Sequence, residues 1–431
     1  MQQTSDGGYI LSGVTYSSGN GSGDMYLVRT DAAGAVQWTG TYGTINLEIG
    51  YAVRQTTDGG FAMCGMFNGF GYDTLSLVRT DVNGNTVWVK HYPGSLGRDL
   101  GYALQQTSDG GFVVCGSSGP SLDDVYVVRT DVNGNMVWSS TIDLGGGEMA
   151  LAVQQTADNG SVVLVQNSGF ADPDGELYLL RLDQNGDTLW THLYATAGAD
   201  EARGLAITAD GGFIIAGGNG DPSRDIQLIR ADAQGIELWR RVHATVGDEL
   251  AMDVQQLDDG GFIVAGRKEN ALTGDIEMHL LRTDANGFMD WERSYLRGVY
   301  SEAQSLDRTS DGGFILLGTT TDVFGGFTNF DMYLVKTDGA GYSAIREGAD
   351  GGSVVHVFPN PAADRFCVEI TDFGQTAALL FDPSGRAVWQ GSFTGPGTST
   401  MNLAPFPSGA YVLELMDRNG HLQRKVLFIA R

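Results

Sequence analysis

The 431-residue sequence has few cysteines and few basic residues, and each scarcity narrows what the chain can be. Its three cysteines form no Cys-x-x-Cys pair, so neither a zinc site nor a redox centre of that kind is indicated. No stretch approaches the ~18 uninterrupted apolar residues of a membrane span. Only 26 Lys and Arg stand against 52 Asp and Glu, so the net charge of −26 disfavours nucleic acid and anionic lipid as partners.

Glycine is abundant by contrast, at 63 residues against 10 prolines, beside a hydrophobic fraction of 42%. This combination is typical of many short strands joined by tight turns, not of disorder. The chain is too long for one ordinary core, so we expect two domains or a repeat array. The acidic composition suits solubility and cation binding.

One unit of about 50 residues occurs seven times, which is typical of a propeller or solenoid. Each unit opens with Asp-Gly-Gly, continues with (Arg/Lys)-x-Asp-x-x-Gly and places a Trp seven residues after that second Asp, except in the last. The first motif begins at Asp6, Asp58, Asp109, Asp210, Asp259 and Asp311, with Asp158-Asn159-Gly160 as the divergent copy. The second Asp is Asp31, Asp81, Asp131, Asp183, Asp232, Asp284 or Asp338, and the Trp is Trp38, Trp88, Trp138, Trp190, Trp239 or Trp291.

Each unit predicts four β-strands, A to D, with D beginning at the Trp. Strand C carries adjacent apolar residues, as in Leu27-Val28, so both of its faces should be buried. We therefore predict an all-β chain whose residues 1–346 form a seven-bladed β-propeller of four-stranded antiparallel blades. The chain starts at the end of strand A, so we expect the natural protein to begin upstream, with the missing inner strand and an export signal.

The repeated polar residues are predicted to be structural. Asp-Gly-Gly and Asp-x-x-Gly suit tight turns between A and B and between C and D. The Arg two residues before the second Asp, such as Arg29 before Asp31, should form a local ion pair with it. Cys64 and Cys115 occupy one repeat position as small core residues, too far apart to bridge.

The unit resembles the repeat of quinoprotein-type propellers, in which Asp, Gly and Trp at the C–D turn let the Trp pack against the next blade. The matching residues include Asp131, Gly134 and Trp138. The Asp–Gly spacing is one residue shorter here. Nothing matches the paired cysteines and calcium ligands associated with pyrroloquinoline quinone, so the resemblance implies the fold without the cofactor.

The pattern changes after residue 346. Residues 347–353 are predicted to be a Gly-rich linker, and residues 354–431 a small Ig-like β-sandwich of about seven strands. This segment resembles the C-terminal sorting domain of the type IX secretion system of Bacteroidota. That resemblance implies recognition by the secretion machinery and an extracellular or outer-membrane location. It rests on Pro359, Asn360, Pro361, Gly385, Gly409, Tyr411 and Lys425.

In an antiparallel blade the A–B and C–D turns share one face, and here they are nearly identical in every copy. The B–C and D–A connections share the other, which we call the variable face and expect to carry function. Its candidate ligand-binding aromatics and amides lie in the B–C loops of blades 2 and 7. They are Phe67, Asn68, Phe70, Tyr72, Phe324, Phe327, Asn329 and Phe330. Alternatively, these side chains pack on their own blade.

An acidic residue recurs before strand A and could ring the channel mouth on the variable face, where it would bind a cation or sugar hydroxyls. The positions are Glu48, Asp99, Glu148, Glu201, Glu249 and Glu302. The alternative, which we favour, is that these carboxylates cap turn amides.

No catalytic motif stands out, and the six histidines share no spacing. We predict no metal ligands and no cofactor. Calcium is compatible with the composition, but Asp172-Pro173-Asp174-Gly175 is too short for an EF-hand loop. A secreted or cell-surface module that binds an extracellular glycan or protein is the function we favour. The alternatives are an extracellular propeller enzyme acting on polysaccharide, a quinoprotein-like enzyme, and a purely structural surface protein.

Overall fold

The structure is a computed structural model whose chain forms two compact units, Met1–Ala344 and Ile345–Arg431. It describes residues 1–69, 71–94, 97–119, 123–168, 175–195, 200–220, 223–321, 331–343, 355–358, 365–370, 375–382, 386–394, 397–407, 409–416 and 422–429. Each unit is considered by itself.

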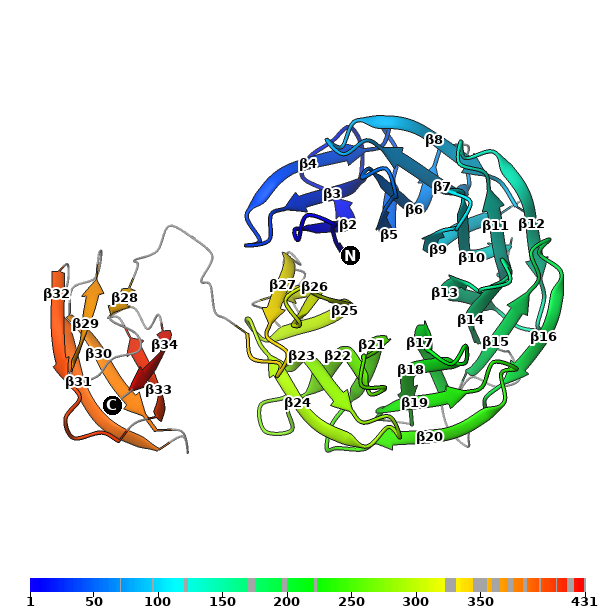
Figure 1. The fold of residues 1–431 in the computed structure, drawn as a ribbon. Helices are drawn as coiled ribbons and strands as arrows, with labels where there is room; N and C mark the ends of the chain where they lie inside the picture. The colour runs from blue at the N-terminus through cyan, green and yellow to red at the C-terminus, as the bar shows by residue number, and fades with distance from the viewer. Residues whose placement is uncertain are drawn as a thin grey trace. The chain divides into compact units, whose positions relative to one another are not determined.

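The first unit is a seven-bladed β-propeller, with antiparallel blades arranged in a ring (Figure 1). Blades 1 to 3 are β1–β4 (Gln2–Gln3, Tyr9–Thr15, Asp24–Thr30, Val36–Tyr42), β5–β8 (Glu48–Gln55, Phe61–Asn68, Asp73–Thr80, Thr86–Tyr92) and β9–β12 (Arg98–Gln106, Phe112–Gly119, Asp124–Thr130, Met136–Ile142). Blades 4 and 5 are β13–β16 (Glu148–Gln155, Ser161–Asn167, Glu176–Leu182, Thr188–Leu193) and β17–β20 (Asp200–Ile207, Phe213–Asn219, Asp225–Ala231, Glu237–His243). Blades 6 and 7 are β21–β24 (Glu249–Gln256, Phe262–Glu269, Ile276–Thr283, Met289–Tyr295) and β25–β27 (Tyr300–Arg308, Phe314–Thr321, Asp331–Thr337).

The order of strands follows from their burial. The two middle strands of a blade are apolar on both faces and buried, as in β10 (FVVCGSSG), because neighbouring blades cover both sides. The outermost strands, such as β12, alternate between exposed and half-buried residues. Each outer strand begins two residues before its Trp, so the predicted start of strand D was late; Trp88, for example, follows Thr86 in β8. Cys64 and Cys115 are buried free thiols, as predicted.

The Asp-Gly-Gly turns form the tight reversals that the sequence predicted. In blade 2 the Asp58 carboxylate accepts bonds from the Gly60 amide at 3.3 Å and the Thr56 hydroxyl at 2.6 Å. Gly59 adopts a φ of +87°, a conformation that side chains disfavour. The divergent fourth copy keeps this geometry with Asn159 at +65°, since Asn tolerates the left-handed region better than most residues.

The predicted ion pair within the C–D turn was wrong in its partner. Arg29 pairs with Asp6 of the A–B turn at 2.5 Å, not with Asp31. The Asp31 carboxylate instead accepts the amides of Ala33 and Ala35 in its own turn, at 2.8 and 2.9 Å. All seven units share this arrangement, since a buried or half-buried cation from strand C meets the turn that joins A and B. The pairs are Arg29–Asp6, Arg79–Asp58, Arg129–Asp109, Arg181–Asp158, Arg230–Asp210, Arg282–Asp259 and Lys336–Asp311.

The repeated Trp packs between blades, which confirms that prediction. The ring of Trp88 lies against Gly134, so a Cβ built on that glycine would lie 2.8 Å from the indole. The same ring meets Phe112 of the next blade edge-on, with centroids 6.1 Å apart. Tyr92, at the end of the same strand, donates its hydroxyl to the Gly134 carbonyl at 2.7 Å. The Trp and the Tyr of this outer strand thereby both contact the C–D turn of the following blade.

Glutamines connect the inner strands. The side chain of Gln256 accepts the Ala209 amide of the preceding blade at 2.8 Å, and comparable bonds join blades 1 and 2, 2 and 3, and 3 and 4. A glutamine also joins blades 1 and 7 and so closes the ring. The Gln3 side chain accepts the Ser310 amide at 2.9 Å, and the Gln3 backbone N–H donates to the Asp307 carboxylate at 2.8 Å. Met1 packs with Leu317 in the apolar core between blades 1 and 7.

The second unit is a β-sandwich of seven described strands in two sheets, as predicted. One sheet has the order β28-β29-β32 and the other β31-β30-β33-β34. Their bounds are Val355–Phe358, Arg365–Ile370, Gln375–Phe381, Ala387–Thr394, Gly397–Asn402, Gly409–Met416 and Leu422–Ile429 for β28 to β34. Its core includes Phe366, Leu380 and Leu413.

Candidate functional site

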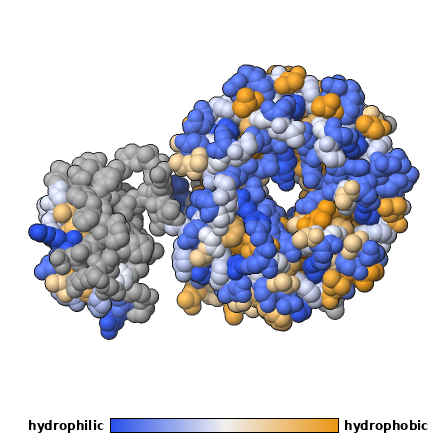
Figure 2. Space-filling view, in the orientation of Figure 1, coloured by the Kyte–Doolittle hydropathy of each residue, from blue (hydrophilic) through white to orange (hydrophobic). Residues whose placement is uncertain are grey.

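The candidate site is the mouth of the central channel on the variable face. Figure 2 shows the channel as an opening in the ring of blades. The first strand of each blade lines it, as Figure 1 shows for β5, β9, β13, β17, β21 and β25. These strands begin on the variable face, where the D–A connections enter them.

The predicted aromatic cluster is only partly described. Phe67 is half-buried and stacks on His91 of its own blade, with ring centroids 4.1 Å apart. Asn68 donates to Asp73 at 2.8 Å, and Tyr72 is half-buried. These contacts favour the alternative that blade 2 residues pack on their own blade. Phe70, Phe324, Phe327, Asn329 and Phe330 lie outside the described residues.

Five of the six acidic residues before strand A are buried, and three of the six cap loop amides, as the favoured alternative predicted. Glu48 accepts the Thr44 amide at 3.1 Å, Asp99 the Gly94 amide at 2.9 Å, and Glu148 the Gly146 amide at 2.7 Å. With Glu249 they are at most 2% exposed. They therefore do not form a solvent-facing ring at the mouth.

Burial shapes the ionisation of these carboxyl groups. It raises the pKa of Asp99, Glu148 and Glu249, since a charged carboxylate is disfavoured away from water. Glu201 differs. Burial also acts to raise its pKa, but the neighbouring Arg203 and Arg224 outweigh that effect and lower it.

A chain of alternating charges crosses blades 5 to 7 on the variable face, and single-residue motifs did not reveal it. Arg224 donates to Glu201 at 2.6 Å and to Asp248 through two bonds of 2.9 Å. Arg267 continues the chain, donating to Asp248 at 2.8 Å and lying 3.5 Å from Glu302. The members are Arg203, Glu201, Arg224, Asp248, Arg267 and Glu302, with side chains 8–32% exposed.

The opposite part of the mouth is aromatic. Tyr51 and Tyr102, from the inner strands of blades 2 and 3, meet edge-on with centroids 5.2 Å apart. Both occupy a β-bulge, where the inner strand carries one residue more than its partner. The same bulge recurs in every later blade with a different side chain: Leu151, Arg203, Met252 and Gln304. The same bulge position thus carries a different type of side chain in the blades around the channel. The residue pattern of the sequence predicts only a regular strand there and does not reveal the bulge.

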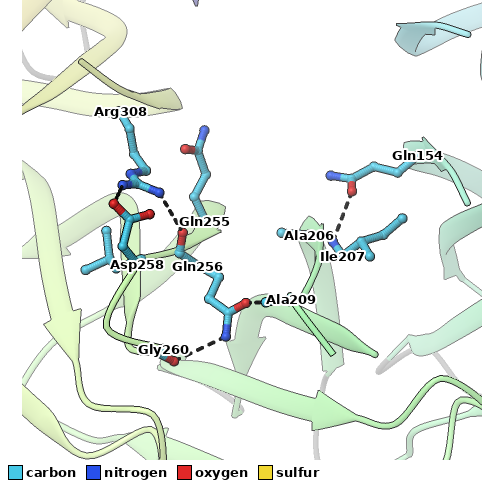
Figure 3. Close-up of a pocket in the computed structure, with 10 residues that line it drawn as sticks. Gln154, Ala206, Ile207, Ala209, Gln255, Gln256, Asp258, Gly260 and Arg308 are labelled. Carbon is cyan, nitrogen blue, oxygen red and sulfur yellow. Dashed lines mark hydrogen bonds and ion pairs between the residues drawn. The ribbon is translucent and has the colours of Figure 1, made fainter. Parts of the chain in front are cut away.

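A cavity of about 560 Å³ lies at the other end of the channel, where inner strands meet A–B turns. Figure 3 shows its polar groups bound to one another: Gln154 to Ile207, Gln256 to Ala209 and Gly260, and Arg308 to Asp258. None of the predicted site residues lines it. The polar side chains that line this cavity thus form hydrogen bonds and an ion pair with other residues of the protein.

Two of the described histidines have structural surroundings. His192 contacts the Gln234 carbonyl at 3.0 Å, and buried His279 lies 3.3 Å from Glu292. Hydrogen bonding from His279 lowers the pKa of Glu292 to about 2, with Lys268 also contributing.

In the sandwich, the hydroxyl of buried Tyr411 donates to the Pro407 carbonyl at 3.0 Å. Gly409 begins β33, and Lys425 of β34 pairs with Leu413 of β33. The other predicted sorting-signal residues lie outside the described residues; they are Pro359, Asn360, Pro361 and Gly385.

Residues 356–429 match the family described as the secretion system C-terminal sorting domain. They form a type IX sorting domain. This domain directs the chain to the cell surface or the extracellular space of Bacteroidota and implies an interaction with the secretion machinery. The described residues contain no helix long and apolar enough to cross a membrane.

The known proteins that resemble this chain are distant from it in sequence. An endo-acting ulvan lyase of Formosa agariphila is 29% identical over 86 residues, which is 20% of this chain. The chain spans 17% of that enzyme's length. Among solved structures, a puromycin hydrolase S511A mutant complexed with PGG aligns over 89% of this chain and 58% of its own, with a TM-score of 0.53 and 14% identity. The BP39L lectin of Burkholderia pseudomallei aligns over 80% of this chain and 96% of its own, with a TM-score of 0.51 and 10% identity. The likeness to these two solved structures supports the propeller fold.

Proposed function

We propose that the exported propeller binds an extracellular glycan at the channel mouth on the variable face. The observation that carries this proposal is the division of the mouth into the Tyr51–Tyr102 pair and the arginine–carboxylate chain of blades 5 to 7. Aromatic rings offer apolar faces to a sugar ring, while guanidinium and carboxylate groups exchange hydrogen bonds with hydroxyls. Glycan sites commonly need both.

The charges favour a neutral glycan over a strongly anionic one. Three arginines balance three carboxylates in the chain of charges across blades 5 to 7, so this group of residues carries no net charge. The whole chain carries −26, which repels polyanions at long range. Binding of an anionic polysaccharide should therefore be weaker and should strengthen with added salt.

Burial favours binding over catalysis. Asp99, Glu148 and Glu249 have raised pKa values, as a general acid would need, but they are at most 1% exposed. A substrate in the channel mouth does not reach a carboxyl group enclosed by its own loop. A protein ligand and a purely structural role are the competing outcomes of the test.

The test is affinity electrophoresis and calorimetry of the full chain against a panel of neutral and anionic polysaccharides. Tyr51→Ala and Tyr102→Ala should each weaken binding about two- to tenfold, as loss of one aromatic contact does, and leave the melting temperature near that of the wild type. Phe288→Ala is the matched control, because this aromatic is 58% exposed on the opposite face, in a C–D turn. If Phe288→Ala weakens binding and the two tyrosine changes do not, the proposed site is wrong.

A further inference from the structure

Three carboxylates converge between blades 3 and 4 on the variable face, away from the groups proposed to bind a glycan. Asp124 begins β11, Asp143 follows β12, and Glu148 begins β13. One oxygen from each residue lies within 4.8 Å of the others. Among the residues that the structure describes, none of the ion pairs of blades 2 to 5 includes any of the three. Three negative charges thus gather without a protein cation.

Two buried oxygens at this place lack donors. Glu148 is fully buried; its Oε1 accepts the Gly146 amide at 2.7 Å, while its Oε2 is without a hydrogen-bond partner. Asn167, 3% exposed, is the cross-strand partner of Glu148, and its Oδ1 is also without a partner. Partners directly opposite project on the same side of the sheet. Both side chains approach Gly146, since a Cβ on that glycine would lie 2.0 Å from the Asn167 Oδ1.

Such an arrangement is costly unless a cation completes it. A buried acceptor that has lost water and gained no donor costs roughly 1–3 kcal/mol, and like charges add repulsion. Burial raises the pKa of Asp124 and of Glu148, and the Asp143 carboxylate raises both further.

The equivalent carboxylates between blades 2 and 3 have hydrogen-bond donors and a cation within the protein. Between blades 2 and 3, Asp73 and Asp99 occupy the repeat positions of Asp124 and Glu148. There Asp73 accepts a bond from Asn68 at 2.8 Å and pairs with Arg98 at 3.3 Å. Asp99 accepts the Ser118 hydroxyl at 2.6 Å, and Ser118 stands where blade 4 has Asn167. Blade 4 thus has the Asn167 carboxamide where blade 3 has the Ser118 hydroxyl that donates to its carboxylate.

We propose that Asp124, Asp143, Glu148 and the amide oxygen of Asn167 bind a calcium ion. Three carboxylates and one amide oxygen are the hard ligands that calcium prefers, and water can supply the remaining positions. Calcium accepts the irregular geometry of ligands drawn from three strands and a loop, whereas magnesium demands a near-octahedral set. The bound ion would fasten the D–A connection, which contributes Asp143, to both blades.

Calorimetry of the full chain, freed of metal with EDTA and titrated with calcium chloride, tests this site. We expect binding with a Kd on the order of 10⁻⁴ to 10⁻³ M, the range of extracellular modules, and a rise in melting temperature on calcium addition. Magnesium should bind at least tenfold more weakly. No binding at millimolar calcium, or tighter binding of magnesium, would overturn the assignment.

Variants locate the ion. Asp143→Asn should lower calcium affinity at least tenfold, and its fold should persist because this side chain is exposed. Asp73→Asn, the matched change one blade earlier, should leave one calcium equivalent bound as in the wild type. Asn167→Asp should bind calcium more tightly, since it adds a charged ligand. The proposal fails if Asp143→Asn titrates like the wild type, or if Asn167→Asp binds calcium more weakly.

Discussion

Removal of one inter-blade tryptophan offers a quantitative test of how blades hold together. In Trp88→Ala the chain loses a half-buried ring that lies against Gly134 and meets Phe112 edge-on at 6.1 Å. A fully enclosed large aromatic buries roughly 150–250 Å². Half of that area at about 25 cal/mol per Å² corresponds to about 2–3 kcal/mol. The edge-to-face contact adds about 0.5–1.5 kcal/mol, so we expect a loss of about 3–4 kcal/mol in the free energy of unfolding.

Trp138→Ala should cost about 1 kcal/mol less, because its partner position lacks the aromatic ring. Ser161 stands at the start of β14, where the second strands of blades 2, 3, 5, 6 and 7 begin with Phe. Trp138 compensates in part by donating its indole N–H to the Gln184 carbonyl at 2.9 Å. A cavity of about 390 Å³ opens beside it.

Urea denaturation followed by far-UV circular dichroism would measure both losses. Val87→Ala is the matched control, because Val87 lies on the same outer strand and is 59% exposed, so its effect should stay within about 0.5 kcal/mol. Equal midpoints for Trp88→Ala and Val87→Ala would refute the view that the ring holds blades 2 and 3 together. A larger loss for Trp138→Ala than for Trp88→Ala would refute the contribution assigned to the aromatic pair.

Three further perturbations have defined outcomes. Ser161→Phe restores the missing ring and should raise stability by about 1–2 kcal/mol in the same denaturation assay; a lower midpoint would mean that the site has no room for it. Arg79→Ala should lose about 2–3 kcal/mol by unpairing Asp58 and buried carbonyls, whereas an exposed ion pair would cost under 1 kcal/mol. Thr309 and Lys336 hold the pKa of Asp311 at about 2, below its unfolded value, so its contribution is present above pH ~4 and lost as pH falls toward 2. In thermal melts across this range, Asp311→Asn should therefore lose less stability on acidification than the wild type does.

The repeat made the fold predictable from the sequence. Seven copies of two turn motifs specify seven hairpin pairs, because Asp, Asn and Gly act through their own backbone within a few residues. Doubly apolar strands such as Leu27-Val28 imply cover on both faces, which in a repeat array means neighbouring blades. The sorting domain was likewise readable, because its resemblance lay in local motifs.

Sequence reasoning reached less of the candidate site. It favoured capping of turn amides by the acidic residues before strand A, as Asp99 and Glu148 do, but it did not anticipate the ion pairs that Glu201 forms with Arg203 and Arg224. Nor could it distinguish Tyr51 from its neighbours, since a bulge is a property of strand register and not of the residue type.

The sequence by itself determined the number of blades, the turn chemistry and the presence of the sorting domain, since each depends on residues close together in the chain. Tertiary structure alone decided the partners across strands and blades. Arg29 pairs with Asp6 and not with Asp31, two residues away, because the Asp31 carboxylate already accepts hydrogen bonds from amides of its own turn. Arg224 and Arg267 share Asp248 only because the ring brings blades 5 and 6 together. Spacing along the chain carries no information about such meetings, which depend on the twist and closure of the whole ring.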